Sequence, residues 1–222
     1  LYCIHGFGVR RSVEFEPLKK YYESKGHTVI TIHLFDQTNE SDIDPQVWIQ
    51  RAKDGLEPLI KENRRVWLVG FSMGGVIASH LASLYPIERV VLLAPAFEYV
   101  TLQTVKNVAT GAVRAILNKP KTSTSEYPAL PDSFAPVFRN VIASCRDSIS
   151  QPVLFLHGSE DEVIPVRSSQ NAYAKVKHPY KLLLVIEGVL HRILDDEAHQ
   201  TDVLHIIDEF FSGKLITIES KE

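Results

Sequence analysis

The stretch from Arg65 to Ala78 constrains the fold of this chain more than any other part of its sequence. An apolar run, Val66 to Val69, leads directly into Gly70-Phe71-Ser72-Met73-Gly74, and apolar residues then recur at helical spacing until Pro86. A serine flanked by glycines in this way is typical of a sharp turn from a strand into a helix, because bulkier residues beside it would collide with neighbouring backbone. The stretch therefore predicts a strand, a tight turn that projects the Ser72 hydroxyl, and a helix.

A serine hydroxyl is a poor nucleophile until a base removes its proton, and an acid must orient that base. His191 follows the last strong strand pattern, and Asp161 follows the strand pattern before it. Both should therefore stand at the carboxyl ends of parallel strands, where Ser72 also projects. The chain order Ser72, Asp161, His191 is the order that this turn predicts. Three further acids compete with Asp161 for its role: Glu98, Glu160 and Glu162.

A serine nucleophile also needs two backbone N–H groups that face the negative charge that develops on the substrate. Met73 follows the serine at the start of the predicted helix, so its N–H is a candidate. The second candidate is the N–H of Phe7, just after the first strand in His5-Gly6-Phe7-Gly8, where glycines allow close approach. We expect His5 to hold this loop by hydrogen bonds rather than to take part in chemistry.

Short apolar runs alternate with helical patterns along the whole chain, which predicts a mostly parallel central sheet with helices on both faces, an α/β fold. Pro58 lies inside one helical stripe and predicts a kink or a break there. The predicted strands cover residues 1–4, 28–32, 66–69, 89–94, 152–157 and 180–186, and the pattern at 215–218 suggests a short extra edge strand. The predicted helices cover about 15–25, 45–60, 73–85, 166–176 and 204–211.

One region, about residues 97–150, interrupts this alternation, because it has helical patterns but no strand pattern. The helical patterns cover about 102–116 and 131–142. An insertion of this length at the carboxyl side of the sheet is well placed to form a small helical cap over Ser72. We therefore expect one domain over residues 1–222 with a cap insertion.

Composition excludes several classes of function. The net charge is only −3, so no electrostatic footprint for nucleic acid is visible, and no apolar run is long enough to span a membrane. No sequence pattern for a metal site, a dinucleotide or a phosphate-binding loop occurs, so no cofactor and no metal are expected. Cys3 and Cys145 match no redox spacing and predict free thiols in a reducing, cytoplasmic setting.

Four motifs together resemble the α/β-hydrolase superfamily, and within it small bacterial carboxylesterases and monoacylglycerol lipase-like enzymes. They are His5–Gly8, Gly70–Gly75, the segment from His157 to Pro165, and the late His191. The resemblance extends from Leu1 to about Phe211, although Leu190 stands where the family usually has glycine. It implies a central, mostly parallel sheet with a helical cap, a Ser-Asp-His triad and no cofactor.

The function implied is hydrolysis of a small-molecule carboxylic ester of short-to-medium acyl or monoacylglycerol type. The same residues suit a thioesterase, a peptidase, an acyltransferase or a carbon–carbon hydrolase, so these alternatives stay open. A ligand receptor that keeps the fold without turnover is the alternative from another class. The sequence leaves the oligomeric state and the physiological role open.

Overall fold

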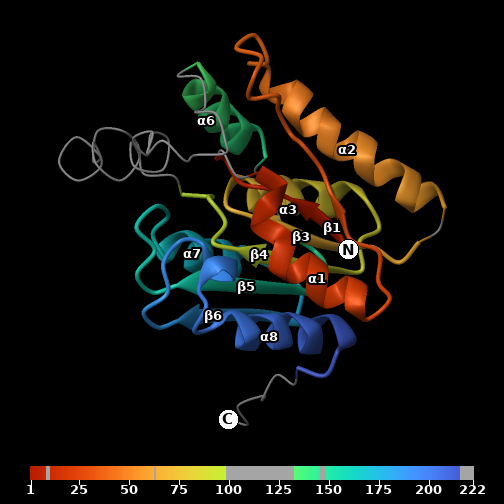
Figure 1. Ribbon diagram of the computed structural model, residues 1–222, viewed down its shortest axis with the longest axis vertical. Helices are drawn as coiled ribbons and strands as arrows, with labels where there is room; N and C mark the ends of the chain where they lie inside the picture. The colour runs from red at the N-terminus through yellow and green to blue at the C-terminus, as the bar shows by residue number, and fades with distance from the viewer. Residues whose placement is uncertain (9–10, 63, 99–132, 146–148, 216–222) are drawn as a thin grey trace.

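A computed structural model describes residues 1–8, 11–62, 64–98, 133–145 and 149–215. Within these residues, six strands form one sheet in the order β2-β1-β3-β4-β5-β6, and every neighbouring pair is parallel (Figure 1). This confirms the predicted α/β architecture. The strands are β1 (Tyr2–Ile4), β2 (Ile30–Thr31), β3 (Trp67–Phe71), β4 (Arg89–Leu93), β5 (Val153–Gly158) and β6 (Lys181–Ile186).

Helices cover both faces of the sheet (Figure 1). One face carries α1 (Glu16–Ser24) and α8 (Gln200–Ser212). The other face carries α2 (Pro45–Lys61), α3 (Met73–Leu84), α6 (Phe134–Ser144) and α7 (Arg167–Lys175). Two short 3-10 helices, η1 (Arg11–Phe15) and η2 (Ile193–Asp195), complete the described elements.

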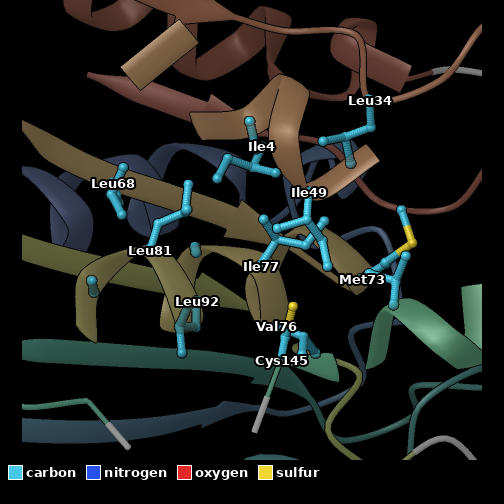
Figure 2. Close-up of a cluster of buried hydrophobic side chains, with 14 of the residues drawn as sticks. Ile4, Leu34, Ile49, Leu68, Met73, Val76, Ile77, Leu81, Leu92 and Cys145 are labelled. Carbon is cyan, nitrogen blue, oxygen red and sulfur yellow. The ribbon is translucent and has the colours of Figure 1, made fainter. Parts of the chain in front are cut away.

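The core consists of two apolar layers, one on each face, because successive residues of a strand point to opposite sides. In β3, Leu68 belongs to the layer under α2 and α3, and Val69 belongs to the layer under α1 and α8. Figure 2 shows part of the first layer, in which Leu68 of the sheet lies near Leu81 of α3, and Ile77 of α3 lies near Ile49 of α2. The side chains that form both layers are almost fully buried. A shift of one residue would move each of them to the other face of the sheet, so this burial fixes the register of the central strands.

Three details differ from the sequence prediction. The second strand is only two residues long. The last strand, β6, is an edge strand with half-buried side chains, although its run of leucines indicated burial on both faces. Pro58 does not break α2, which continues to Lys61. Because Pro58 lies in the last turn of the helix, it removes only one hydrogen bond near the frayed end.

The predicted cap insertion lies between β4 and β5. Its predicted helix at 102–116 lies outside the described residues, as do residues 216–218 of the suggested edge strand. The predicted helix at 131–142 corresponds to α6, which contacts α2 and α3 and buries its apolar side chains against them. Phe138 of α6 also stacks on Phe7, with ring centroids 5.0 Å apart.

Cys3 and Cys145 are both buried and free, as predicted. In the described ranges, no helix has the length and apolar character needed to cross a bilayer.

Candidate active site

Ser72 stands in the turn between β3 and α3 with φ 53° and ψ −117°. A positive φ is unfavourable for a residue with a side chain and persists only where the surroundings enforce it. Here the Ser72 N–H donates to the Leu93 carbonyl at 2.9 Å, and the Ser72 carbonyl accepts from the N–H groups of Gly75 and Ala96 at 3.0 and 3.1 Å. The residue is only 5 % exposed. These contacts form the strained turn that the glycine pattern predicted.

The glycines around Ser72 are required by close backbone contacts. A Cβ on Gly74 would overlap the carbonyl oxygen of Ile4 and lie 2.5 Å from that of His5. A Cβ on Gly70 would overlap the backbone of α3. At Gly6, a Cβ would lie 3.1 Å from the Ser72 Cβ. The first turn of α3 is therefore packed directly against β1 and the loop after it, which brings that loop to the serine.

The structure brings His191 and Asp161 into direct contact. The His191 Nδ1 atom lies 2.7 Å from Asp161 Oδ2, and both side chains are at least nine-tenths buried. A carboxylate can only accept, so Nδ1 carries the proton and Nε2 keeps its lone pair, the form that a general base needs. The loop that carries His191 packs against the end of β5, because a Cβ on Gly158 would overlap the Val189 carbonyl oxygen.

Asp161 is held by four donors. Its Oδ1 atom accepts from the N–H groups of Val163 and Ile164 at 2.8 and 2.7 Å, and Oδ2 accepts from His191 and from His157 Nε2, the latter at 3.1 Å. Burial alone would raise the pKa of this carboxyl, but the hydrogen bonds from the two imidazoles and from a backbone N–H outweigh it. The pKa of Asp161 therefore lies well below its ordinary value.

His157 is a second, fully buried histidine in this network. Its Nε2 atom lies between two acceptors, Asp161 Oδ2 and the Ile164 carbonyl oxygen at 2.9 Å, so this nitrogen carries the proton. The Ser169 hydroxyl, 2.7 Å from Nδ1, is then the donor to the other nitrogen. His157 therefore anchors the carboxylate, although the sequence indicated only that it ends a strand.

The lowered pKa of Asp161 predicts an acid-dependent contribution to stability. Because the folded-state pKa lies below the unfolded value of about 3.9, the contribution is complete above that pH and is lost as the pH falls toward the folded-state pKa. The free energy of unfolding should therefore fall less between pH 6 and pH 3 in Asp161→Asn than in the parent. Urea denaturation at the two pH values measures this, and an equal fall in both proteins would contradict it.

The N–H groups of Phe7 and Met73 are the two oxyanion donors that the sequence predicts. Met73 is the first residue of α3, and Phe7 lies in the loop after β1. Within the described part of the chain, neither N–H donates a hydrogen bond to the protein. His5 bonds both neighbouring segments, with Nδ1 2.7 Å from the Gly6 carbonyl oxygen and Nε2 accepting from the Leu34 N–H at 3.0 Å. The Gly6–Phe7 peptide is thus fixed in orientation, and His5 has the structural role that the sequence indicated.

In the part of the chain that the structure describes, the Ser72 hydroxyl and the His191 imidazole are not hydrogen-bonded to each other. The His191 ring instead lies against Phe71, the residue before the serine, with ring centroids 4.8 Å apart. Hydrogen bonds of catalytic groups are often long in unliganded enzymes and shorten when substrate binds. The imidazole therefore lies beside the serine turn without being bonded to the hydroxyl.

None of the three competing acids bonds the His191 imidazole among the described residues. Glu98 bonds Arg167 and Asn171, and Glu160 is exposed. Glu162 accepts the backbone N–H of His191 at 3.0 Å and so holds the loop rather than the imidazole. The sequence did not indicate this contact, because a carboxylate that binds backbone leaves no pattern of spacing. In the ranges that the structure describes, no cluster of three or more His, Cys, Asp or Glu side chains could hold a metal ion.

Comparison with solved structures shows the α/β-hydrolase fold. A monoacylglycerol lipase from Paleococcus ferrophilus is 18 % identical over 96 % of this chain and 93 % of its own, with a TM-score of 0.68. The structure reported for the metagenome-derived lipolytic enzymes LipS and LipT is 17 % identical, with 96 % and 92 % covered and a TM-score of 0.72. A meta-cleavage product hydrolase from Pseudomonas fluorescens is 20 % identical, with 96 % and 90 % covered and a TM-score of 0.68.

The sequence itself matches one family over almost its whole length. Residues 1–208 of the 222 fit the family described as Uncharacterised protein family (UPF0227). The chain therefore belongs to this family and has the α/β-hydrolase fold.

Proposed function

We propose that this protein is a serine hydrolase that cleaves carboxylic esters through an acyl-enzyme intermediate. The observation that carries the proposal is the hydrogen bond between His191 and a fully bonded Asp161, beside a strained serine turn. This bond leaves the Nε2 atom of His191 free to accept a proton. The proposed catalytic residues are Ser72, Asp161 and His191, and the proposed oxyanion donors are the N–H groups of Phe7 and Met73.

In the proposed reaction, His191 Nε2 takes the proton of the Ser72 hydroxyl as Oγ attacks the ester carbonyl carbon. The N–H groups of Phe7 and Met73 bind the oxyanion of the tetrahedral intermediate, which then expels the alcohol with the proton from His191. Water attacks the acyl-enzyme by the same steps, which releases the acid and restores the serine. Asp161 keeps the imidazole in the required tautomer and stabilises its cationic form.

A small-molecule ester of short-to-medium acyl or monoacylglycerol type is the proposed substrate. The residue that carries one oxyanion donor, Phe7, stacks on Phe138 of α6, so aromatic side chains adjoin the proposed oxyanion site. We include α6 in the proposed cap over residues 97–150 of a single domain. The two free, buried cysteines support a reducing compartment such as the cytoplasm.

Labelling with a fluorophosphonate probe tests the proposal. The probe forms a covalent bond only with an activated serine, so the parent should be labelled on Ser72 and Ser72→Ala should remain unlabelled. Mass spectrometry of the labelled peptide locates the bond. An unlabelled parent protein would favour a ligand receptor without turnover and would contradict the proposal.

A substrate panel then identifies the bond that is cleaved. The panel contains p-nitrophenyl esters of increasing acyl length, a monoacylglycerol, a thioester, a peptide amide and a carbon–carbon substrate. Carboxylic esters should give the highest kcat/KM. A labelled protein that prefers another class would retain the nucleophile but contradict the ester assignment.

A further inference from the structure

Glu14 is a buried carboxylate that the proposed mechanism does not use. It lies in η1, just before α1, and its side chain is 6 % exposed. Its Oε2 atom accepts the backbone N–H of Gly6 at 3.2 Å. Gly6 precedes Phe7, the proposed oxyanion donor, in the segment of residues 5–8, which we call the oxyanion loop.

The other carboxylate oxygen of Glu14 binds a residue beside the proposed base. Arg192 follows His191 directly, and its Nη1 atom lies 3.1 Å from Glu14 Oε1. Arg192 also lies 3.9 Å from Asp195 in η2, and η1 contacts η2. One side chain thus bonds both the oxyanion loop and the segment of residues 187–192, which we call the histidine loop.

The oxyanion loop and the histidine loop approach each other closely next to the Glu14–Arg192 ion pair. A Cβ on Gly8 would lie 3.7 Å from Arg192 Nη2 and 3.8 Å from Glu14 Oε1, so the end of the oxyanion loop rests on the ion pair. Phe71 fills the space on the serine side, because its ring contacts the His191 ring and lies 3.0 Å from a Cβ built on Gly6. The two loops therefore meet around Phe71 and are bonded to each other through Glu14.

This ion pair contributes little net stability, because the cost of burying the Glu14 carboxylate offsets its attraction to the partly exposed Arg192 guanidinium. Its main effect is on geometry, since a carboxylate that has both oxygens bonded fixes the groups that it binds. The groups fixed here are the peptide next to an oxyanion donor and the residue next to the base.

We propose that Glu14 is a positioning residue, which through the Gly6 N–H and the Arg192 guanidinium sets the oxyanion loop relative to the histidine loop. This inference rests on the proposed function. Displacement of a catalytic group by about 1 Å can lower a rate about 100-fold, so the contact should act on kcat. Substrate binding should change little, because the Glu14 side chain is only 6 % exposed and acts through the two loops that it bonds.

Glu14→Met and Glu14→Gln test the proposal. Methionine has a similar length but accepts no hydrogen bond, whereas glutamine keeps an acceptor for the Gly6 N–H and loses the charge that holds Arg192. We expect kcat for p-nitrophenyl butyrate to fall about 10- to 100-fold in Glu14→Met with KM within about 2-fold, and to fall only a few-fold in Glu14→Gln. Hydrogen exchange should become faster in both loops of Glu14→Met.

The pair Asp42–Arg51 provides a matched control. The Asp42 side chain is 5 % exposed. Its Oδ2 atom accepts from Arg51 Nη1 at 2.6 Å and from the Asp36 N–H at 2.7 Å. It contacts neither of the two loops among the bonds of the described residues. Asp42→Leu removes the same kind of contact elsewhere, so it should lower the melting temperature comparably while kcat stays within about 2-fold.

The outcomes separate this inference from the proposed function. A labelled, active parent whose kcat is unchanged by Glu14→Met, or lowered no more than by Asp42→Leu, would overturn the role of Glu14.

If the parent is neither labelled nor active, the proposed function fails, and hydrogen exchange alone decides whether Glu14 connects the loops. Unchanged exchange in both loops would then overturn the connection. If Glu14→Met does not fold, the few-fold loss of kcat in Glu14→Gln decides, and its absence counts against the proposal.

Discussion

Replacement of Asp161 by asparagine is expected to lower kcat for ester hydrolysis about 10⁴-fold. An asparagine amide can donate to His191 Nδ1, which would move the imidazole proton to Nε2 and remove the lone pair that accepts the serine proton. Each carboxylate oxygen accepts two donors, so an asparagine amide would turn its NH₂ group either toward the two imidazoles or toward the two backbone N–H groups. KM should change much less than kcat, because Asp161 is buried behind the imidazole and does not face the substrate.

Steady-state kinetics with p-nitrophenyl butyrate and the rate of fluorophosphonate labelling measure this loss. The surface supplies a matched control, because Asp196 accepts from His199 Nδ1 at 2.8 Å in the same kind of pair. Asp196→Asn should therefore retain kcat within about 2-fold. An Asp161→Asn protein with more than about a tenth of the parental kcat would show that another group orients the base.

Replacement of Gly74 by alanine is expected to have the largest effect on stability, a loss of about 3 kcal/mol or more in the free energy of unfolding. The added Cβ would overlap the Ile4 carbonyl oxygen, and the backbones of Gly74 and Ile4 are held in place by α3 and the sheet. The clash can be relieved only if the helix moves away from β1. Such a movement would also displace the Met73 N–H and the serine turn.

Urea denaturation of Gly74→Ala and of Gly26→Ala measures the loss in the free energy of unfolding for each variant. The comparison separates the cost of a steric clash from the cost of replacing a glycine that has no close neighbour. Gly26 has φ 82°, but a Cβ there meets nothing within 4 Å. Gly26→Ala should therefore lose only about 1 to 2 kcal/mol, from the left-handed backbone alone. A loss in Gly74→Ala no larger than that in Gly26→Ala would contradict the close approach of the helix and β1.

The sequence predicted the central sheet well, because apolar runs and glycine spacing are local signals. Leu68 and Val69 are apolar since both faces of their strand are covered, and this double burial is what a parallel sheet requires. The edge position of β6 could not be predicted in this way. Leucines that are only partly covered at an edge strand give the same run of letters as leucines that are fully buried in a central strand.

The interaction network around the proposed triad was less predictable than its members. The chain order of serine, acid and histidine has a sequence signal, and the structure joins Asp161 to His191. The hydrogen bonds that Glu14 and Glu162 accept from backbone N–H groups have no sequence signal, because these bonds depend on which loops lie next to each other in the folded chain. Pro58 shows the converse: its local signal predicted a kink or a break, but the helix is not broken there and continues to Lys61.

The alternation of β3 between the two apolar layers limits how this strand can vary. Leu68 and Val69 belong to opposite layers, and the strand then continues without a spacer into Ser72. Loss or gain of one residue would send each side chain to the wrong side of the sheet and rotate the hydroxyl with it. Evolution or design can therefore exchange the side chains of β3 for others of similar volume, but the number of residues between its start and the serine is fixed.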